Sequence, residues 1–568
     1  MIVGVFWLLT ANAASLLGAW ALLRRVQTGR TSTDLVLFLL LRLFLISGAV
    51  MAAGLIGGLE RNGLGIVSLM AIAALLRFGV HKSIPPPARP AWGRIGGAVA
   101  AIVVVRLLLQ VWFFSPHLGD ATAYHLPKIA EWIQHRGFTR EMGLHPHVTF
   151  PAGFELVETW WVVFLRHDVL IELAGVEFLV LAFAATYGLA DRLGLSDRSS
   201  FFAALSTILV PGLNLTTTSC MNDGPAAALV IATVALVVLQ APIPCILMTM
   251  GLGLGVKPTY GFALTGIALL WGMSRKDSPA SPSPSRIVAW SLAAGGMGIG
   301  VYWYLRNLVW FGNPFHPLGT SEIDNPVAVQ FGPRVSSLWT NLADLVNVRI
   351  YDQGYLGANI DDIAGWGPLA FACGLPALVI ALRSGPLFRR LTGCLLVSLG
   401  TSLLFSRSDP WHLKYVLYFP VLLTLAAAWF AERNLVFARI SWAALGCCFV
   451  ATLLPYDLPW KDFKGLARQS WSERSALSLL KASVEEKKVG CFGGFTAHAY
   501  LLYGPDFSRE VVYLRVSSAA DLVSEARTSD LRQIYASPSS SLQNAVLREA
   551  VLSGRLRQTS PSIYRLSD

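Results

Sequence analysis

The residue best suited to chemistry is Asp120, which follows Gly119 after a long apolar run and precedes a stretch with helical spacing. If a helix begins near Thr122, its positive end faces Asp120 and favours the ionised carboxylate, the form that a general base must have. Asp120 is therefore a candidate catalytic base. The alternative is that Asp120 only caps the helix.

Aromatic and basic side chains follow Asp120 at regular intervals. Tyr124, Lys128 and Trp132 are spaced by four residues, so a helix presents them on one face, which could lie over a phosphate or a sugar. His145 and His147 are two residues apart without an evident third ligand, so no metal site is predicted, although a divalent cation remains possible.

Further candidate substrate-binding residues recur along the chain, and they are His145, Glu155, Asn222, Asp223, Arg306, Asn307, Arg407, His412 and Lys414. Simpler explanations stay open for them, since an acidic residue can cap a helix and an arginine at the end of a span can extend its charge to water. The functional explanation is that the cations clamp a lipid phosphate.

The composition shows which elements must position these residues. Of the 568 residues, 54% are hydrophobic and only 14% are charged, and the mean hydropathy is +0.54. An ordinary soluble domain is about one quarter charged, so the chain is predicted to be an integral membrane protein. The net charge of +11 could indicate nucleic acid, but the basic residues gather in short loops between apolar runs, which is a topology signal. No nucleic-acid partner is predicted.

Apolar runs of the length that crosses a bilayer recur through residues 1–455, and they predict about fourteen helices. We expect spans near residues 3–23, 34–57, 63–80, 97–115, 169–190, 200–219, 224–241, 243–256, 260–274, 287–309, 366–383, 390–406, 413–431 and 438–455. The apolar segment 154–165 is short for a span and is assigned to the outer interface. The glycines from Gly295 to Gly300 indicate close helix packing rather than phosphate binding.

Basic residues predict the orientation. The connections that contain Arg24, Arg275, Arg383 and Arg433 fall on one side, which the positive-inside rule assigns to the cytoplasm. The long loops 116–168 and 310–365 are then expected outside, on the outer side of a bacterial inner membrane. Residues 456–568 lie there too and read as a small α/β domain, with strands beginning at Lys488 and at Glu510 and helices at 496–503, 518–527 and 541–552.

The motifs together resemble the GT-C superfamily of membrane glycosyltransferases, near the protein O-mannosyltransferase and lipid A aminoarabinose transferase branch. Asp120 with Tyr124 resembles the family's catalytic aspartate and the helix after it, and Asn222 with Asp223 resembles its second outer acidic motif. Arg306-Asn307 and the turn 407–415 resemble later family segments. This chain departs from the family pattern in two ways. Several spans precede the Asp120 loop where many relatives have one, and Asp120 stands alone where relatives carry an acidic pair.

The resemblance implies a GT-C-like helical membrane domain and an inverting transfer of sugar from a polyprenyl-phosphate donor to a hydroxyl of a glycan, lipid or protein acceptor. Asp120 would take the proton of the acceptor, and Arg306, Lys128, His412 and Lys414 would stabilise the leaving phosphate. No cofactor is implied. The alternatives are a diphosphate-linked oligosaccharide donor, a transporter or lipid flippase, and a binding or scaffold protein.

Overall fold

The computed structural model of the chain describes residues 2–78, 93–113, 116, 120–140, 143, 145–274, 285–318, 365–383, 385–405, 412–453, 486–493, 499–504, 506–537, 541–560 and 562–567. Most of the predicted loop 310–365, the residue Arg407 and the start of the predicted helix 496–503 lie outside these ranges. Of His412 only the backbone is described.

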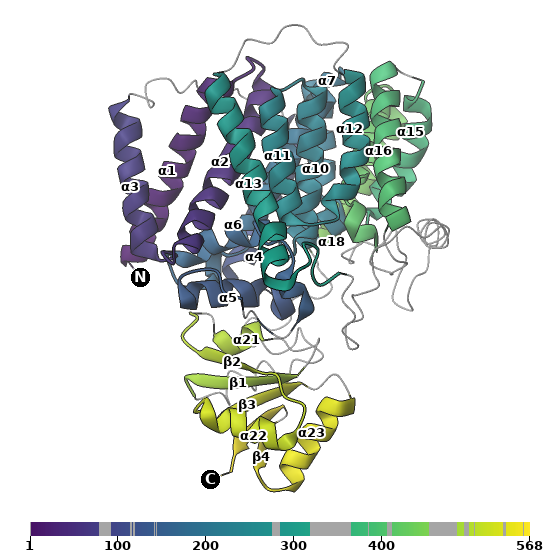
Figure 1. Cartoon of the computed structure of the whole chain (residues 1–568). Helices are drawn as coiled ribbons and strands as arrows, with labels where there is room; N and C mark the ends of the chain where they lie inside the picture. The colour runs from purple at the N-terminus through teal and green to yellow at the C-terminus, as the bar shows by residue number, and fades with distance from the viewer. Residues whose placement is uncertain are drawn as a thin grey trace.

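Helices make up the membrane domain (Figure 1). They are α1 (Ile2–Val26), α2 (Thr31–Leu55), α3 (Arg61–Arg77), α4 (Gly93–Phe113), η2 (Ala121–His125), α5 (Leu126–His135), η3 (Pro146–Thr149), α6 (Gly153–Val163), η4 (Asp168–Leu170), α7 (Leu173–Arg192), α8 (Asp197–Ile208), α9 (Pro211–Thr217), α10 (Asp223–Val238), α11 (Ile243–Val256), α12 (Tyr260–Ser274), α13 (Arg286–Phe311), η7 (Leu369–Gly374), α15 (Leu375–Ala381), α16 (Pro386–Phe405), η8 (His412–Val416), α17 (Pro420–Ala431) and α18 (Leu435–Leu453). Helical structure therefore occupies every stretch in which a span was expected.

Five of these elements are long and apolar enough to cross a membrane by themselves, namely α1, α2, η4 with α7, α13 and α16. The predicted span 200–219 is instead the pair α8 and α9, bent by 63°. The bend coincides with Pro211 at the start of α9, where proline removes a backbone donor and clashes with a continuous helix. Several other apolar helices are shorter, with 10 to 17 residues. The chain is an integral membrane protein.

Close contacts between glycines join α11 to α13. A Cβ atom placed on Gly300 would lie 2.0 Å from the carbonyl oxygen of Gly251, and one placed on Gly296 would lie 2.6 Å from that of Met248. Small residues that let two backbones approach are a common basis of helix packing in membranes. The packing role predicted for the glycines of this segment is confirmed.

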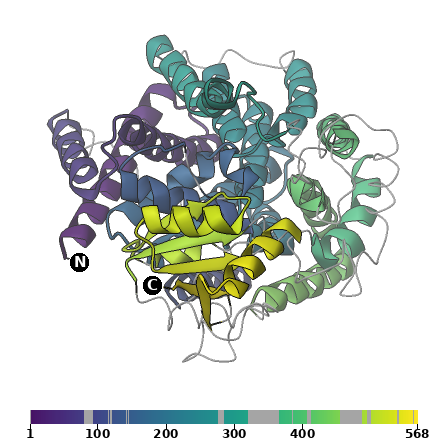
Figure 2. The ribbon, with the colours of Figure 1, turned by 60° about the horizontal axis from the view of Figure 1, so that its bottom comes forward.

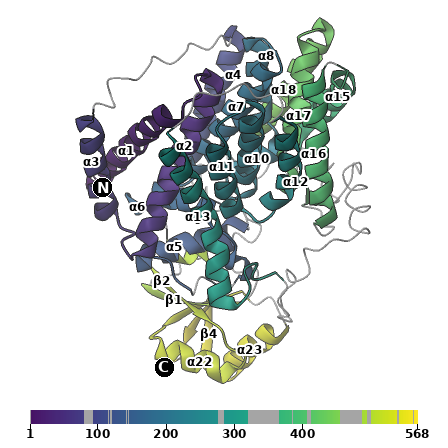
Figure 3. The same cartoon turned by 45° about the horizontal axis from the view of Figure 1, so that its top comes forward.

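The bundle has two ends (Figures 1 and 3). One end, called the outer end here, carries α5, α6 and the C-terminal domain, whereas the basic turns after α1 and α7 lie at the opposite end. Both views place α3 at one edge of the bundle and α15 and α16 at the other edge. The short helix α6 is almost entirely buried, packs between α5 and the helices α2, α7 and α11, and belongs to the outer end.

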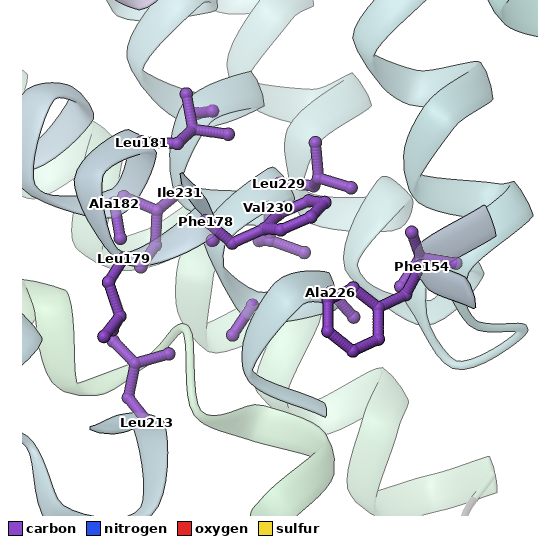
Figure 4. Close-up of a cluster of buried hydrophobic side chains, with 14 of the residues drawn as sticks. Phe154, Phe178, Leu179, Leu181, Ala182, Leu213, Ala226, Leu229, Val230 and Ile231 are labelled. Carbon is purple, nitrogen blue, oxygen red and sulfur yellow. The ribbon is translucent and has the colours of Figure 1, made fainter. Parts of the chain in front are cut away.

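An apolar core forms where α6, α7, α9 and α10 meet (Figure 4). Phe154 of α6 stacks edge-on against Phe178 of α7 with 5.6 Å between their ring centres. Leu213 of α9 and Leu229 of α10 are buried in the same cluster. This core fixes the outer ends of the helices that carry the candidate site.

The C-terminal domain is a small α/β unit lying across the outer end of the bundle (Figure 2). Its elements are β1 (Lys488–Gly493), α21 (Tyr500–Tyr503), β2 (Glu510–Leu514), α22 (Ala519–Thr528), β3 (Gln533–Ser537), α23 (Ser541–Leu552), β4 (Leu556–Ser560) and β5 (Ile563–Leu566). The sheet order is β2-β1-β3-β5-β4. β1 pairs in parallel with β2 and β3, while β5 is antiparallel to β3 and β4. The predicted α/β class and the two predicted strands are confirmed.

Candidate active site

Asp120 stands at the start of the outer loop, directly before η2, a short π-helix that continues into α5. Its own backbone is helical, and its side chain makes no capping hydrogen bond. The capping explanation is therefore wrong, because residue 120 is already part of the helical path. Its Oδ2 lies instead 3.2 Å from Nζ of Lys414, with 39% of the aspartate side chain exposed.

A second ion pair lies beside the first. Lys257, directly after α11, places Nζ 2.5 Å from Oδ1 of Asp223, the first residue of α10. The ring of Tyr415 lies near both lysines, with its centre 4.9 Å from Nζ of Lys257 and 5.6 Å from Nζ of Lys414. We call Asp120, Lys414, Tyr415, Asp223 and Lys257 the charge cluster. It combines two carboxylates and two ammonium groups at the outer end, and four of its members line a small pocket.

The electrostatics keep the first pair ionised. Burial alone would raise the pKa of Asp120, but the charge and hydrogen bond of Lys414, with smaller interactions from His125 and His147, outweigh burial and hold that pKa well below its usual range. Burial alone would lower the pKa of Lys414, but Asp120, Tyr415 and Asp223 outweigh it and raise that pKa above its usual range. Near neutral pH the carboxylate of Asp120 is therefore negatively charged and partly exposed.

Tyr124 joins Asp120 to a group of imidazoles. Its ring stacks on His145 with 4.7 Å between the ring centres and meets His147 edge-on at 5.1 Å. Burial, followed by the negative charge of Asp120, raises the pKa of Tyr124 well above its usual value. The phenol therefore stays protonated, and its O–H group donates a hydrogen bond to the carboxylate of Asp120. Tyr124 and His145, predicted as site residues, lie next to the candidate base.

Lys128, which was expected to stabilise the leaving phosphate, lies inside the protein. Its ammonium group is completely buried and pairs with Oε1 of Glu155, which also lies 2.9 Å from Nδ1 of His125. Burial would raise the pKa of Glu155, but Lys128 and His125 outweigh it and lower the pKa to about 2. Because its charge is already paired inside the protein, Lys128 holds α5 against α6 rather than facing a phosphate.

Arg306 and Asn307 are likewise engaged within the protein. Nη2 of Arg306 donates to the carbonyl oxygen of Thr149 at 2.5 Å, and Nδ2 of Asn307 donates to the same oxygen at 3.0 Å. The guanidinium also lies over the rings of Trp303 and Trp310. Only 5% of Arg306 is exposed, so it does not extend to water. The two residues fix the turn that carries His145, which in turn stacks on Tyr124.

Asn222 has a similar supporting position. Its Nδ2 donates to the carbonyl oxygen of Val256 at 3.1 Å, and thereby fixes the end of α11 beside Lys257. Sequence reasoning missed Lys257. The signal was available, because a lysine between the expected spans 243–256 and 260–274 falls on the outer side, against the general bias of positive charge. Within the described residues, no group of three or more His, Cys, Asp and Glu side chains is arranged to hold a metal ion.

Comparison with solved structures identifies the fold. The structure of ArnT from Cupriavidus metallidurans bound to undecaprenyl phosphate superposes with a TM-score of 0.53 at 13% sequence identity, over 82% of this chain and 97% of that chain. The chain has the GT-C fold. The resemblance stated from the sequence motifs is thereby confirmed at the level of the fold.

Two further structures are similar. The apo form of the same ArnT gives a TM-score of 0.49 at 14% identity, over 76% of this chain and 88% of that chain. An oligosaccharyltransferase from Archaeoglobus fulgidus, tethered to an acceptor peptide, gives a TM-score of 0.41 at 10% sequence identity, over 84% of this chain and 74% of that chain. No protein-family model matches this GT-C-fold chain, and no curated protein sequence matches it either.

Proposed function

We propose that this protein is an inverting glycosyltransferase that moves a sugar from a polyprenyl-phosphate donor to an acceptor hydroxyl at the outer end of the bundle. The observation that carries the proposal is the pair of Asp120 and Lys414, an ionised and half-exposed carboxylate beside a cation. The GT-C fold supports it, since the ArnT structure of this fold holds undecaprenyl phosphate.

In the proposed reaction, the acceptor oxygen attacks the anomeric carbon while Asp120 takes the hydroxyl proton. The bond from that carbon to the phosphate oxygen breaks in the same step, so the configuration inverts and polyprenyl phosphate leaves. Negative charge develops on this leaving group, and the ammonium groups of Lys414 and Lys257 are the described cations of the charge cluster that could stabilise it.

Donor binding would also activate the base. In the structure, the ammonium group of Lys414 contacts the carboxylate of Asp120. A donor phosphate competes for this ammonium group, and its own negative charge raises the pKa of the aspartate. Asp120 thereby becomes a stronger base only when a donor is present, which limits unproductive proton transfer.

We place this site outside the cytoplasm of a bacterial cell, in the inner membrane. In support, basic residues at the ends of α1 and α7 lie at the end of the bundle away from the charge cluster. The acceptor class remains a hydroxyl-bearing glycan, lipid or protein.

The test uses the purified full-length protein, a radiolabelled polyprenyl-phosphate hexose and a bacterial envelope extract as the acceptor. Asp120→Asn keeps the shape of the side chain but removes its basicity, so transfer should fall by about 10²–10⁴. The control is Asp530→Asn, since Asp530 is exposed in the C-terminal domain and has a left-handed backbone that asparagine accepts. Binding of undecaprenyl phosphate, measured by native mass spectrometry, should persist in both variants. Full transfer by Asp120→Asn would refute the base assignment.

A further inference from the structure

The C-terminal domain forms a hydrogen bond to the buried carboxylate of Glu131 in the outer loop 116–168. Tyr503 of α21 is completely buried, and its hydroxyl donates to Oε1 of Glu131 on α5. Glu131 is only 4% exposed, and its Oε2 lies 3.2 Å from Nδ1 of His135. The hydroxyls of Tyr503 and Tyr513 are 2.6 Å apart, so the phenol of Tyr503 is held from both sides.

Further hydrogen bonds join the C-terminal domain to the same loop. Nε2 of Gln134 donates to the carbonyl oxygens of Phe507 and Arg509, at 3.2 and 2.5 Å. Tyr500 donates to Oδ2 of Asp168 at 2.7 Å, and Arg515 donates to the carbonyl oxygen of Gly143 at 2.8 Å. The residues contacted, from Glu131 to Asp168, all belong to the loop 116–168 that begins at the candidate site. In Figure 1, α21 and β2 accordingly lie directly beneath α5.

A continuous path leads from Tyr503 to Asp120. Glu131 is part of α5, α5 continues η2 without a break, and Asp120 immediately precedes η2. α21 packs against both η2 and α5. The far end of α5 is held separately, because the backbone N–H of Leu59 donates to the carbonyl oxygen of Arg136 at 2.9 Å. A helix fixed at several points transmits a shift at Glu131 to its first turn.

We propose that Tyr503 is a positioning residue, through which the C-terminal domain sets the place of Asp120 and Tyr124 relative to Lys414. The role in transfer rests on the proposed function, whereas the control of α5 by Tyr503 does not. Burial, together with Tyr513 and Glu131, raises the pKa of the Tyr503 phenol well above its usual value, so the phenol remains a donor at all working pH values.

The experiment compares Tyr503→Phe with the wild-type protein in two measurements on the full chain. Hydrogen exchange of the peptide 121–135 reports on α5 directly, and steady-state transfer from the polyprenyl-phosphate hexose reports on the site. The matched control is Tyr564→Phe, because Tyr564 lies in β5 of the same domain, packed against a different apolar cluster. Gln134→Ala is the second variant, which removes the side-chain bonds to Phe507 and Arg509 and serves if Tyr503→Phe does not fold.

Tyr503→Phe should speed exchange in the peptide 121–135 by about tenfold or more and lower kcat by a similar factor, with KM for the donor unchanged. Tyr564→Phe should behave as wild type in both measurements. Unchanged exchange in the peptide 121–135 for Tyr503→Phe and Gln134→Ala would overturn the proposal, whatever their activity. If the wild-type protein transfers no sugar, the proposed function fails, yet the exchange measurement still decides the role of Tyr503.

Discussion

The carboxylate of Asp120 and the ammonium group of Lys414 are 3.2 Å apart, although 294 residues separate them in the sequence. The pair joins the start of the outer loop to η8, the short helix before α17. Because only part of Asp120 is shielded from water, a substrate can reach the carboxylate without the helices separating.

Removing the cation of this pair should impair transfer. Lys414→Met keeps the length of the side chain but withdraws positive charge from a departing phosphate, so kcat should fall by about 10²–10³. The control is Lys488→Met, since Lys488 forms an exposed pair with Glu510 in the C-terminal domain, and such pairs contribute little. The measurement is steady-state transfer of a radiolabelled hexose. Equal activity of the two variants would exclude Lys414 from the reaction.

The pH dependence of transfer should report the same pair. Lys414 depresses the pKa of Asp120, so the carboxylate is ionised above this low pKa and loses its function as the pH falls through it. In Lys414→Met the pKa of Asp120 rises toward its ordinary value, about 3.9. The acid limb of kcat/KM, which reports the free protein, should therefore move to higher pH in the variant when transfer is measured at decreasing pH. An acid limb that stays in place would mean that Asp120 is not the titrating base.

The buried pair of Lys128 and Glu155 should matter for stability. Lys128→Met leaves the buried carboxylate of Glu155 with His125 as its remaining partner among the described ion pairs, and losing one partner of such a pair costs about 3–5 kcal/mol. The double variant Lys128→Met with Glu155→Gln removes both charges and should recover part of this loss. Thermal unfolding in detergent measures the effect. Additive losses in the double variant would show that the two side chains do not form a pair.

The glycine contact between α11 and α13 gives a prediction with an internal control. In Gly300→Ala the new methyl group would lie 2.0 Å from the carbonyl oxygen of Gly251, so the two helices must separate. Gly298→Ala, on the opposite face of α13, adds a methyl group with no atom of a neighbouring segment within 4 Å. The first variant should lower the unfolding temperature by several degrees and the second should not, as measured by light scattering on heating.

Much of the fold could be predicted because its determinants are local. Apolar runs locate the helices, and the polar composition after Tyr456 predicts the α/β domain, whose first described element is β1. The bend at Pro211 was missed, since the apolar run continues across it. The capping explanation for Asp120 failed because the backbone is already helical at Asp120, two residues before the expected start near Thr122.

The candidate site was predicted only in part, because its partners are remote in the sequence. A buried lysine and an exposed one look alike in a sequence, so Lys128 could not be recognised as the partner of Glu155. Arg306 was expected to bind phosphate, yet it bonds the carbonyl oxygen of Thr149, an acceptor that every residue type supplies. Lys257 was overlooked although its position on the outer side was a signal, because its ion pair with Asp223 is formed only by the fold.

The shortness of α6 has a topological consequence. Its 11 residues extend over only about 17 Å, well below the roughly 30 Å of a bilayer core. α6 also packs beside α5 at the outer end of the bundle (Figure 1), so the chain enters and leaves α6 at that same end. Were α6 long enough to cross, every later crossing would reverse direction, and Asp120 and Tyr503 would end in separate compartments with the lipid between them.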